Sequence, residues 1–245
     1  MTSPPPSWYL DPQQPGLLRW WDGLQWTVYT ATVPAATPGT IRPVRVLGMA
    51  SSVLVLLVVL LELVLAVLSV PSANRIDDAF SQGGDGAGVF TAYDGFAWVE
   101  AAVVIAAYVV TCLWLRRVRV NAEVLNPYAR HVRARGWVWG GWICPVVSWW
   151  FPYQIVRDIV RATADGGRST GRGIGRGIGR WWTFFLIWSL TSYALTRTGW
   201  DRSVPAVQMV AAIAAIIAGV GWVRIVGAVA CDQQAYAATH PTRTA

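Results

Sequence analysis

The chain has 245 residues, of which 54% are hydrophobic and only 13% carry a charge. This balance excludes an ordinary soluble domain and indicates a protein that lives in a membrane. The formal net charge is +7 and every basic side chain is an arginine. Because these arginines cluster beside apolar segments, we expect them to face anionic lipid and not nucleic acid.

The first 43 residues divide into three segments by composition. Residues 1–7 are proline-rich and are predicted to be disordered. Residues 8–29 form a short tryptophan-rich stretch, which we predict to be a compact β-hairpin module. Residues 30–43 contain further prolines and are predicted to be an extended linker. The module is therefore tethered to the rest of the chain.

The hairpin prediction rests on an Asp-Gly pair at 22–23, which lies between two apolar, aromatic-rich runs. In a two-residue turn Trp21 would pair with Leu24, and Arg19 with Trp26. That register places these four side chains on one face, where an arginine packed on a tryptophan adds about 0.5–1 kcal/mol if exposed.

A hairpin of this size cannot bury all of its aromatic surface. Trp8 and Tyr9 are expected to cover part of it. The rest either docks on the membrane or on the remainder of the chain, or forms a groove for a proline-rich or aromatic peptide. The candidate partner-binding residues are Arg19, Trp20, Trp21 and Trp26.

Four apolar segments are close to or above the ~20 residues that a helix needs to cross ~30 Å of hydrocarbon. They lie at about 46–70, 96–115, 181–196 and 204–228, inside a membrane domain of residues 44–231. Their apolar residues are continuous, whereas the strands of a membrane barrel alternate. The predicted fold is thus mainly α, a bundle of four spanning helices with the small β-module at its N-terminus.

Orientation follows from the distribution of charge between the segments. The stretches before the first segment and after the second are rich in arginine, whereas residues 71–95 are acidic and glycine-rich. Both termini, including a tail of residues 232–245, are therefore expected in the cytoplasm. The exclusive use of arginine, with abundant Ala, Gly and Val, indicates a GC-rich genome and hence a bacterial inner membrane.

The segment 136–153 is basic on both sides, so it cannot obey the charge rule if it spans. Its glycines, prolines and tryptophans favour an interfacial or re-entrant element, and a fifth spanning helix is the alternative. Its interfacial tryptophans are Trp137, Trp139, Trp142, Trp149 and Trp150.

Residues 154–164 alternate with helical period and are predicted to form an amphipathic helix on the inner leaflet, with Arg157 and Arg161 on its polar face. The Gly-Arg repeat of residues 171–180 follows no predicted strand. It therefore lacks the context of a phosphate-binding loop and is predicted to be a flexible basic loop.

Charged side chains inside spanning segments are costly, so each is a functional hypothesis. Glu62 and Glu100 both fall in the outer half of the predicted bundle and could share a site that handles protons or cations. The structural alternative pairs Glu62 with Arg197, with Arg202 or with polar groups of neighbouring helices. In that reading Glu100 reaches water, and Arg224 reaches the inner headgroups.

Other reactive side chains lack the spacing of a catalytic or metal site. His131 lies in a basic loop and His240 in the tail, and neither has a partner for catalysis. Cys112, Cys144 and Cys231 are odd in number and widely separated, which argues against disulfides or zinc. We expect no enzyme activity, no cofactor and no bound metal.

The last spanning segment carries small residues at four-residue spacing, at Ala211, Ala215 and Gly219. Such a flat stripe allows close packing of helices. The stripe also makes this helix a candidate contact between copies in a homo-oligomer.

Two stretches resemble known families. The sequence Trp8-Tyr9-x-Asp11-Pro12, followed by Arg19-Trp20-Trp21-Asp22-Gly23-x-x-Trp26-Thr27, is similar to the N-terminal module called domain of unknown function 2510. Residues 44–232 resemble the multi-pass domain of unknown function 4328. The carrying residues are Arg116-Arg117, Asn121, Gly136-Trp137, Gly140-Gly141-Trp142, Pro145-Val146-Val147, Pro152-Tyr153-Gln154 and Arg157-Asp158.

The resemblance implies an actinobacterial membrane protein and supplies no activity. From the residues, the leading hypothesis is a non-enzymatic membrane protein whose cytoplasmic module recruits or senses a protein partner through its tryptophans. The alternative is a small proton- or cation-coupled transporter that uses Glu62, with the stretch 140–145 lining its path.

Overall fold

The computed structural model describes residues 6–14, 17–32, 41–84, 89–127, 129–166, 174–197 and 203–239. The chain divides into two compact units, Met1–Gly39 and Thr40–Ala245. The predicted disorder of residues 1–5, most of the linker and the end of the tail lie outside the described residues. Each unit is described by itself.

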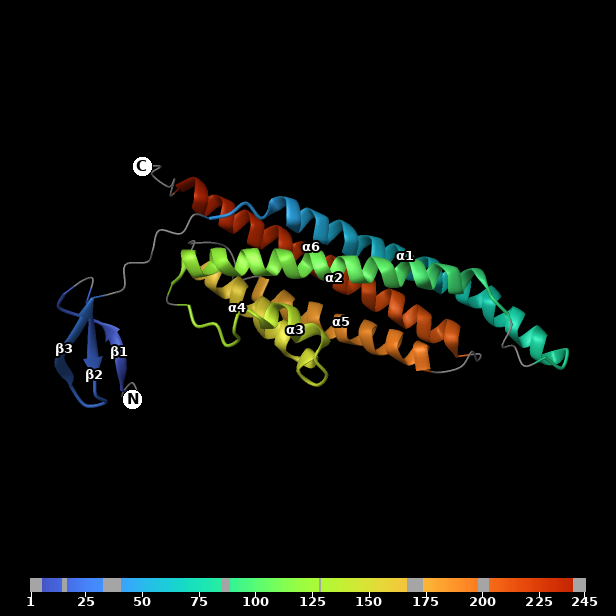
Figure 1. The fold of residues 1–245 in the computed structure, drawn as a ribbon, viewed down its shortest axis with the longest axis horizontal. Helices are drawn as coiled ribbons and strands as arrows, with labels where there is room; N and C mark the ends of the chain where they lie inside the picture. Colours follow the sequence, from blue (N-terminus) through green and yellow to red (C-terminus); the bar gives the residue numbers. More distant parts are fainter. Residues whose placement is uncertain are drawn as a thin grey trace. The chain divides into compact units, whose positions relative to one another are not determined.

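The first unit is an antiparallel sheet of three strands, β1 Ser7–Leu10, β2 Leu17–Trp21 and β3 Trp26–Thr32, in the order β1-β2-β3 (Figure 1). The predicted hairpin is β2 and β3. The first strand was not predicted, because Trp8 and Tyr9 were expected only to cover a face. The third strand also runs three residues into the predicted linker, so the module is longer at both ends.

The turn between β2 and β3 has four residues, not the predicted two. Trp21 pairs with Trp26, where the prediction paired it with Leu24. The reason is the carboxylate of Asp22, whose Oδ1 accepts hydrogen bonds of 2.7 Å from the backbone N–H groups of Leu24 and of Gln25. The side chain therefore closes a longer loop than an Asp-Gly pair alone requires.

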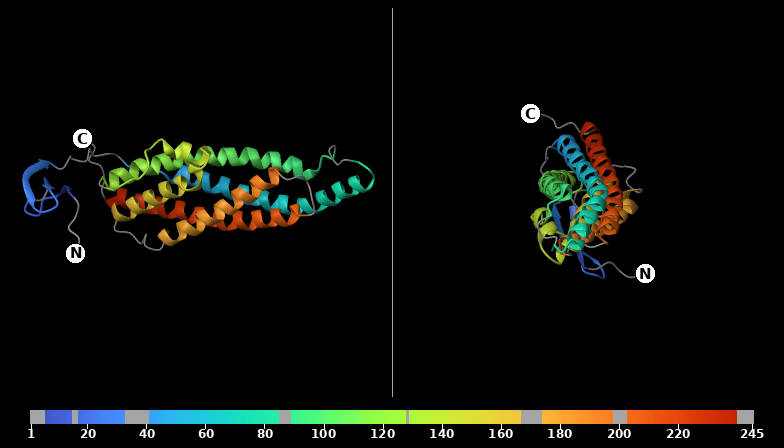
Figure 2. Two further views of the ribbon diagram at one scale, coloured as in Figure 1. Left: turned by 90° about the horizontal axis from the view of Figure 1, so that it is seen from below. Right: turned by 90° about the vertical axis from the view of Figure 1, so that its right-hand side faces the viewer.

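The described residues of the second unit are helical apart from their connections (Figure 2). The elements are α1 Arg45–Ser81, α2 Ala92–Leu125, α3 Trp137–Ile143, the 3₁₀ turn η1 Val147–Trp149, α4 Phe151–Gly166, α5 Ile174–Arg197 and α6 Val204–Thr239. The long helices α1, α2 and α6 lie side by side, α5 lies along α6, and α4 packs on the bundle (Figures 1 and 2).

Three of these helices, α1, α2 and α6, are long and apolar enough to cross a membrane. The sequence predicted four. The difference is α5, whose apolar part is confined between Arg180 and Arg197 and includes several tryptophans, serines and threonines. The helices are also longer than the predicted spans, because a helix continues into water where its hydrophobic run ends: α1 passes through Pro71 to Ser81.

One end of the bundle is defined by hydrogen bonds around Asn121 of α2. Its side chain accepts a bond of 3.0 Å from the N–H of Arg42, and donates bonds of 2.8 Å to the carbonyl of Arg42 and to Gln233. The start of α1, the end of α2 and the end of α6 therefore meet. Because α6 begins at the opposite end, the chain between α2 and α6 runs the length of the bundle, and α5 provides this return.

Small residues allow close contact between α1 and α6. A Cβ built on Gly219 would lie 2.8 Å from Cγ2 of Val59, which is too close for any real side chain. Ala211 and Ala215 on the same face are buried. The predicted small-residue stripe is thus buried within the bundle, and a contact between copies through the last helix stays a prediction.

The segment 136–153 does not form a single helix. It consists of α3, a turn, η1 and the first residues of α4. With a rise of about 1.5 Å per residue, a helix as short as α3 covers about 10 Å and cannot cross a bilayer. A fifth spanning helix at this place is therefore excluded, and the interfacial or re-entrant element remains the prediction.

The predicted amphipathic helix is α4, slightly longer than the expected 154–164. Its apolar face, including Ile155, Val156 and Ile159, is fully buried in the hydrophobic core of the bundle. Protein therefore covers the face that was predicted to meet lipid. An amphipathic pattern specifies that one face is buried but not what buries it.

Candidate functional site

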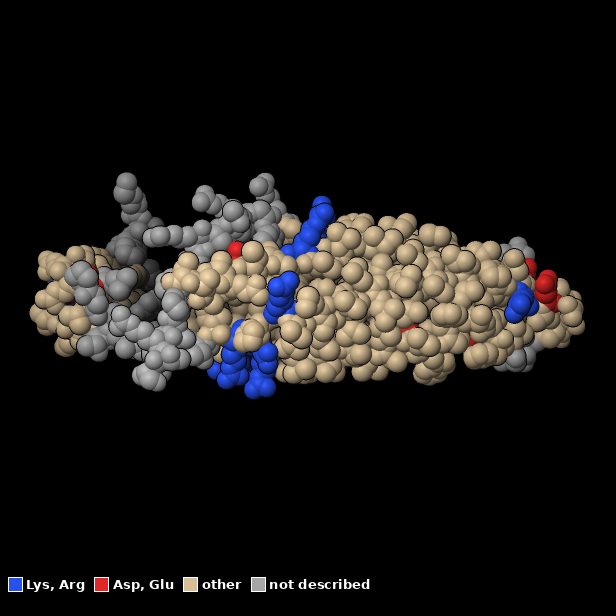
Figure 3. Space-filling view, turned by 90° about the horizontal axis from the view of Figure 1, so that it is seen from above, with Lys and Arg blue, Asp and Glu red and all other residues tan. Residues whose placement is uncertain are grey.

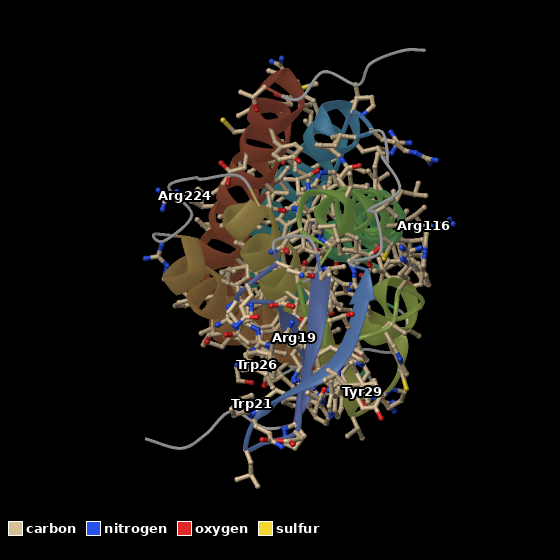
Figure 4. The ribbon with its side chains drawn as sticks, turned by 90° about the vertical axis from the view of Figure 1, so that its left-hand side faces the viewer. Arg19, Trp21, Trp26, Tyr29, Arg116 and Arg224 are labelled. Carbon is tan, nitrogen blue, oxygen red and sulfur yellow. The ribbon has the colours of Figure 1, made fainter. Side chains whose placement is uncertain are left out.

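One face of the N-terminal sheet carries a cluster of three aromatic rings. The ring of Trp26 lies edge-to-face against Trp21, with centroids 5.1 Å apart, and against Tyr9, with centroids 6.1 Å apart. We call Tyr9, Trp21 and Trp26 the aromatic face. Figure 4 shows Trp21 and Trp26 on the same side of the sheet as Arg19, with Tyr29 on the other side.

Trp20 belongs to the opposite face, because successive side chains of a strand point in opposite directions. Its ring packs on Trp8 with centroids 5.6 Å apart. Its carbonyl accepts a hydrogen bond of 2.9 Å from Oγ1 of Thr27. The predicted set of Trp20, Trp21 and Trp26 is therefore split between the two faces, and only the last two share a surface.

Arg19 is held by an ion pair. Its Nε lies 2.9 Å from Oδ2 of Asp11, whose side chain is buried. The other oxygen of Asp11 accepts a bond of 2.8 Å from the N–H of Gln13. This role of Asp11 was not predicted from the sequence, although the residue belongs to the motif that carries the family resemblance. A fixed guanidinium beside the aromatic face offers hydrogen-bond donors to a bound chain.

The aromatic face is partly open to solvent. Trp26 is 40% exposed, and its neighbours along the chain, Leu24 and Val28, are exposed as well. An exposed aromatic surface with an adjacent cation is suited to stacking on proline or aromatic side chains of an extended peptide.

A second polar site lies inside the bundle, around Glu62 of α1. This side chain is only 2% exposed. Its Oε1 accepts hydrogen bonds from the indole N–H of Trp188 and, at 3.4 Å, from Ser192. Its Oε2 accepts a bond of 2.7 Å from Gln208. The partners of Glu62 are thus polar groups of α5 and α6, as one of the predicted alternatives had it.

Glu100 of α2 joins the same cluster. Its carboxyl group lies close enough to Glu62 for the two groups to interact electrostatically, and its Oε1 is buried with no hydrogen-bond partner among the described residues. Tyr93 lies about two helical turns before Glu100 on α2. Its hydroxyl donates a bond of 2.8 Å to Oε1 of Gln208. The structure therefore brings the two predicted intramembrane carboxyls together, where the alternative placed Glu100 in water. We call Glu62, Glu100, Gln208 and Trp188 the carboxyl cluster.

The predicted cationic partners lie elsewhere. The guanidinium of Arg197 lies over the ring of Tyr193, 5.2 Å from its centroid, and Arg202 is outside the described residues. Arg224 is exposed on α6 and points away from the bundle, in the manner expected of a side chain that reaches toward headgroups (Figure 4).

The five predicted interfacial tryptophans divide into two groups. Three of them pack on protein: Trp137 on Phe151, Trp139 on Tyr108, and Trp142 on Trp182 and Phe185. Trp149 and Trp150 are partly open to solvent, at 50% and 40% exposed, although the ring of Trp150 also packs on Phe151. Of the predicted interfacial arginines, Arg161 is exposed, while Arg157 forms an ion pair of 3.1 Å with Asp158.

Among the described residues, no three His, Cys, Asp or Glu side chains come together as metal ligands. Cys112 is buried and donates to the carbonyl of Val138, and all three cysteines are free. His131 lies in the loop before α3, and His240 is outside the described part of the chain.

Apolar helices long enough to cross a bilayer, with a buried carboxyl cluster between them, define a multi-pass membrane protein that carries a small aromatic β-module. Residues 90–233 match the family model described as Domain of unknown function (DUF4328). Because this match covers more than half of the sequence, the chain belongs to that family. Its α1 lies before the matched range.

A second family model, described as Protein of unknown function (DUF2510), matches residues 6–39. This range contains the whole three-stranded sheet. Neither the curated proteins nor the solved structures include a match to the chain. Both resemblances inferred from the sequence motifs are thereby confirmed, and neither family description assigns an activity.

Proposed function

We propose that the chain is a non-enzymatic membrane protein whose N-terminal module recruits a protein partner through an extended peptide. The observation that carries this proposal is the aromatic face, where Trp26 is held between Trp21 and Tyr9 and yet is 40% exposed. Exposed aromatic surface of this kind is typical of interaction sites.

The proposed partner presents proline or aromatic side chains. Their flat rings stack on Trp21 and Trp26, while Arg19, positioned by Asp11, donates hydrogen bonds to the carbonyls of the bound peptide. Because the rings of Trp21 and Trp26 already pack on each other, less side-chain entropy is lost on binding than for rings without such contacts. The bundle holds the module at the bilayer, which raises its effective concentration for a partner at the same membrane.

We place the protein in a bacterial inner membrane with both termini in the cytoplasm. The end of the bundle where Arg42, Asn121 and Gln233 meet is the end that carries most of the exposed arginines, whereas Asp77 and Asp78 lie near the far end of α1. Figure 3 shows most of the visible basic side chains toward one end of the bundle, and acidic side chains beside a basic one at the opposite tip. This asymmetry supports an arginine-rich end inside.

Cysteine labelling tests the orientation. Two single-cysteine variants are compared. One keeps only Cys231, which lies at the arginine-rich end. The other has all three native cysteines replaced and carries Ser81→Cys, which places a thiol at the opposite end. A maleimide that cannot cross membranes should label Ser81→Cys in intact cells and Cys231 only after lysis. The reverse pattern would contradict the proposed topology.

Recruitment is tested by quantitative co-purification of the full-length protein from native membranes. We compare the unmodified chain with Trp21→Ala combined with Trp26→Ala. The matched control is Tyr29→Ala, which removes an aromatic ring that is 67% exposed on the opposite side of the sheet. Partners lost in the double variant and kept in the control support the proposal. Partners kept in all three variants overturn it.

A second candidate function, a proton- or cation-coupled transporter, is favoured by one observation, the proximity of Glu62 to Glu100, whose Oε1 is buried with no hydrogen-bond partner among the described residues. Two ionised carboxylates repel each other strongly when they lie close together in a bundle interior. A proton or a cation between them therefore lowers the energy of the pair. Flux of protons or monovalent cations in proteoliposomes should then fall in Glu62→Gln. Unchanged flux would remove the role assigned to Glu62.

A further inference from the structure

The loop segment 129–136, between α2 and α3, is tied to the bundle through its backbone. The guanidinium of Arg119 on α2 donates a hydrogen bond of 3.1 Å from Nη2 to the carbonyl of Arg133. The carboxylate of Asp158 on α4 accepts a bond of 2.9 Å from the N–H of Val132. The loop is thus held from two helices at once.

Side chains of the loop add further ties. Arg133 donates a bond of 2.8 Å from Nε to Gln154, and its guanidinium lies 3.8 Å from the centroid of the Phe151 ring. Arg135 donates a bond of 2.9 Å from Nε to Oε2 of Glu123. Every one of these contacts joins the loop to α2 or to α4.

His131 lies at the centre of this arrangement. Both ring nitrogens are buried and have no hydrogen-bond partner among the described residues. The charged groups that face it are Arg119 and Glu123 from α2, Arg135 from its own loop and Asp158 from α4. Arg119 is only 5% exposed, so its positive charge cannot turn away into water.

Burial is the main cause that lowers the pKa of His131, and the charge of Arg119 lowers this pKa further, against the opposing effect of Glu123 and Asp158. The docked loop therefore favours the neutral ring. A released loop lets the histidine titrate near its ordinary value of 6.5. Docking is consequently strongest above this value, and it weakens as pH falls toward the lower pKa of the docked state.

We propose that His131 is a proton-sensitive latch, whose protonation releases the loop segment 129–136 from α2 and α4. An imidazolium at this position adds a positive charge beside the buried Arg119. The nearby carboxylates are already engaged: Glu123 binds Arg119 and Arg135, and Asp158 binds the N–H of Val132. Because they already have these partners, the two carboxylates cannot easily reorient toward a new cation.

Release of the loop would also loosen the Trp-rich segment that follows it. Helix α3 begins directly after the loop, and Trp137 in its first turn packs on Phe151 of α4 with ring centroids 4.7 Å apart. The same α4 residue supports Arg133. The latch thereby links the protonation of one loop residue to the docking of residues 137–150.

The test is amide hydrogen exchange of the full-length protein in lipid nanodiscs, measured by mass spectrometry and corrected for intrinsic exchange at each pH. Peptides covering residues 129–136 should lose protection between pH 7.5 and 5.5, by up to about tenfold per pH unit for a single linked proton. His131→Gln, which is neutral at every pH, should abolish this loss, and His240→Gln should leave it unchanged.

Arg135→Gln gives a second readout at a mostly exposed side chain, whose loss should not unfold the bundle. It removes a positive charge that disfavours the imidazolium in the docked loop, which brings the docked and released pKa of His131 closer together, so the loss of protection at low pH should become smaller. Protection that does not depend on pH in the unmodified chain overturns the proposal. So does a pH-dependent loss that persists in His131→Gln, or one that becomes larger in Arg135→Gln.

Discussion

Trp188 of α5 donates its indole N–H to the carboxylate of Glu62 on α1, and Gln208 of α6 donates to the other oxygen of the same group at 2.7 Å. One side chain therefore connects three helices through hydrogen bonds. In a bundle interior these donors have no water to turn to, so they depend on Glu62.

Replacing this carboxylate should destabilise the bundle. We expect Glu62→Ala to lower the free energy of unfolding by about 1–3 kcal/mol, because the donors of Trp188 and Gln208 lose their acceptor while buried. Glu62→Gln keeps one acceptor oxygen and should cost less. The measurement is reversible unfolding in mixed detergent micelles. Glu100→Ala is the control, since Glu100 is less buried, and a larger loss there than at Glu62 would contradict the prediction.

Close packing of α1 on α6 gives a second prediction. A methyl group at Gly219 would meet Val59 at 2.8 Å, whereas one at Gly227, on an exposed part of the same helix, meets nothing within 4 Å. Gly219→Ala should therefore lower stability by about 1–3 kcal/mol. Gly227→Ala should leave it unchanged or raise it by about 0.5–1 kcal/mol, since alanine is the better helix former. Equal effects in thermal unfolding would show that the contact does not constrain the bundle.

The sequence was sufficient for the existence of the long helices, because an unbroken apolar run in a membrane leaves the backbone few alternatives. Their ends were predicted less well. A hydropathy pattern reports where lipid stops, not where the helix stops, so the continuation of α1 through Pro71 to Ser81 was missed. The burial of α4 was missed for a related reason, because protein and lipid select the same apolar face.

The sites were predicted as residue types but not as arrangements. Glu62 and Glu100 were identified by the cost of intramembrane charge, while Gln208 and Trp188, which bind Glu62, carried no such signal. In the module, the register depended on a single side-chain interaction of Asp22. A four-residue loop in place of a two-residue turn changed every pairing that was derived from it.

Backbone strain at Val146 gives a third prediction. This residue has φ 68° and ψ −59°, in a γ-turn closed by a bond of 2.8 Å from the N–H of Val147 to the carbonyl of Pro145. A β-branched residue in this region costs on the order of 1–3 kcal/mol. The side chain is 65% exposed, so little packing is lost by removing it.

Val146→Gly should therefore stabilise the protein by about 1 kcal/mol, after allowing for the greater freedom of glycine in the unfolded chain. Val147→Gly, in the adjacent 3₁₀ turn, is the matched control and should destabilise. The two variants are compared by thermal unfolding in the same detergent. A higher melting temperature for Val147→Gly than for Val146→Gly would refute the strained turn.

The turn of the N-terminal sheet should respond to acid through Asp22. Hydrogen bonds from the backbone of Gln25 and then of Leu24 lower the pKa of this carboxyl below its ordinary value of 3.8. Because the folded pKa is the lower one, the carboxylate supports the turn above pH 3.8, and this support is lost as pH falls through the folded pKa. In selectively labelled full-length protein, the amide resonances of Leu24 and Gln25 should shift together over that acidic range.

Asp22→Asn keeps an acceptor without a charge, so the shift should disappear while the loop persists. Asp22→Ala should free both amides at neutral pH, and unchanged amide resonances in that variant would show that the side chain does not set the length of the loop.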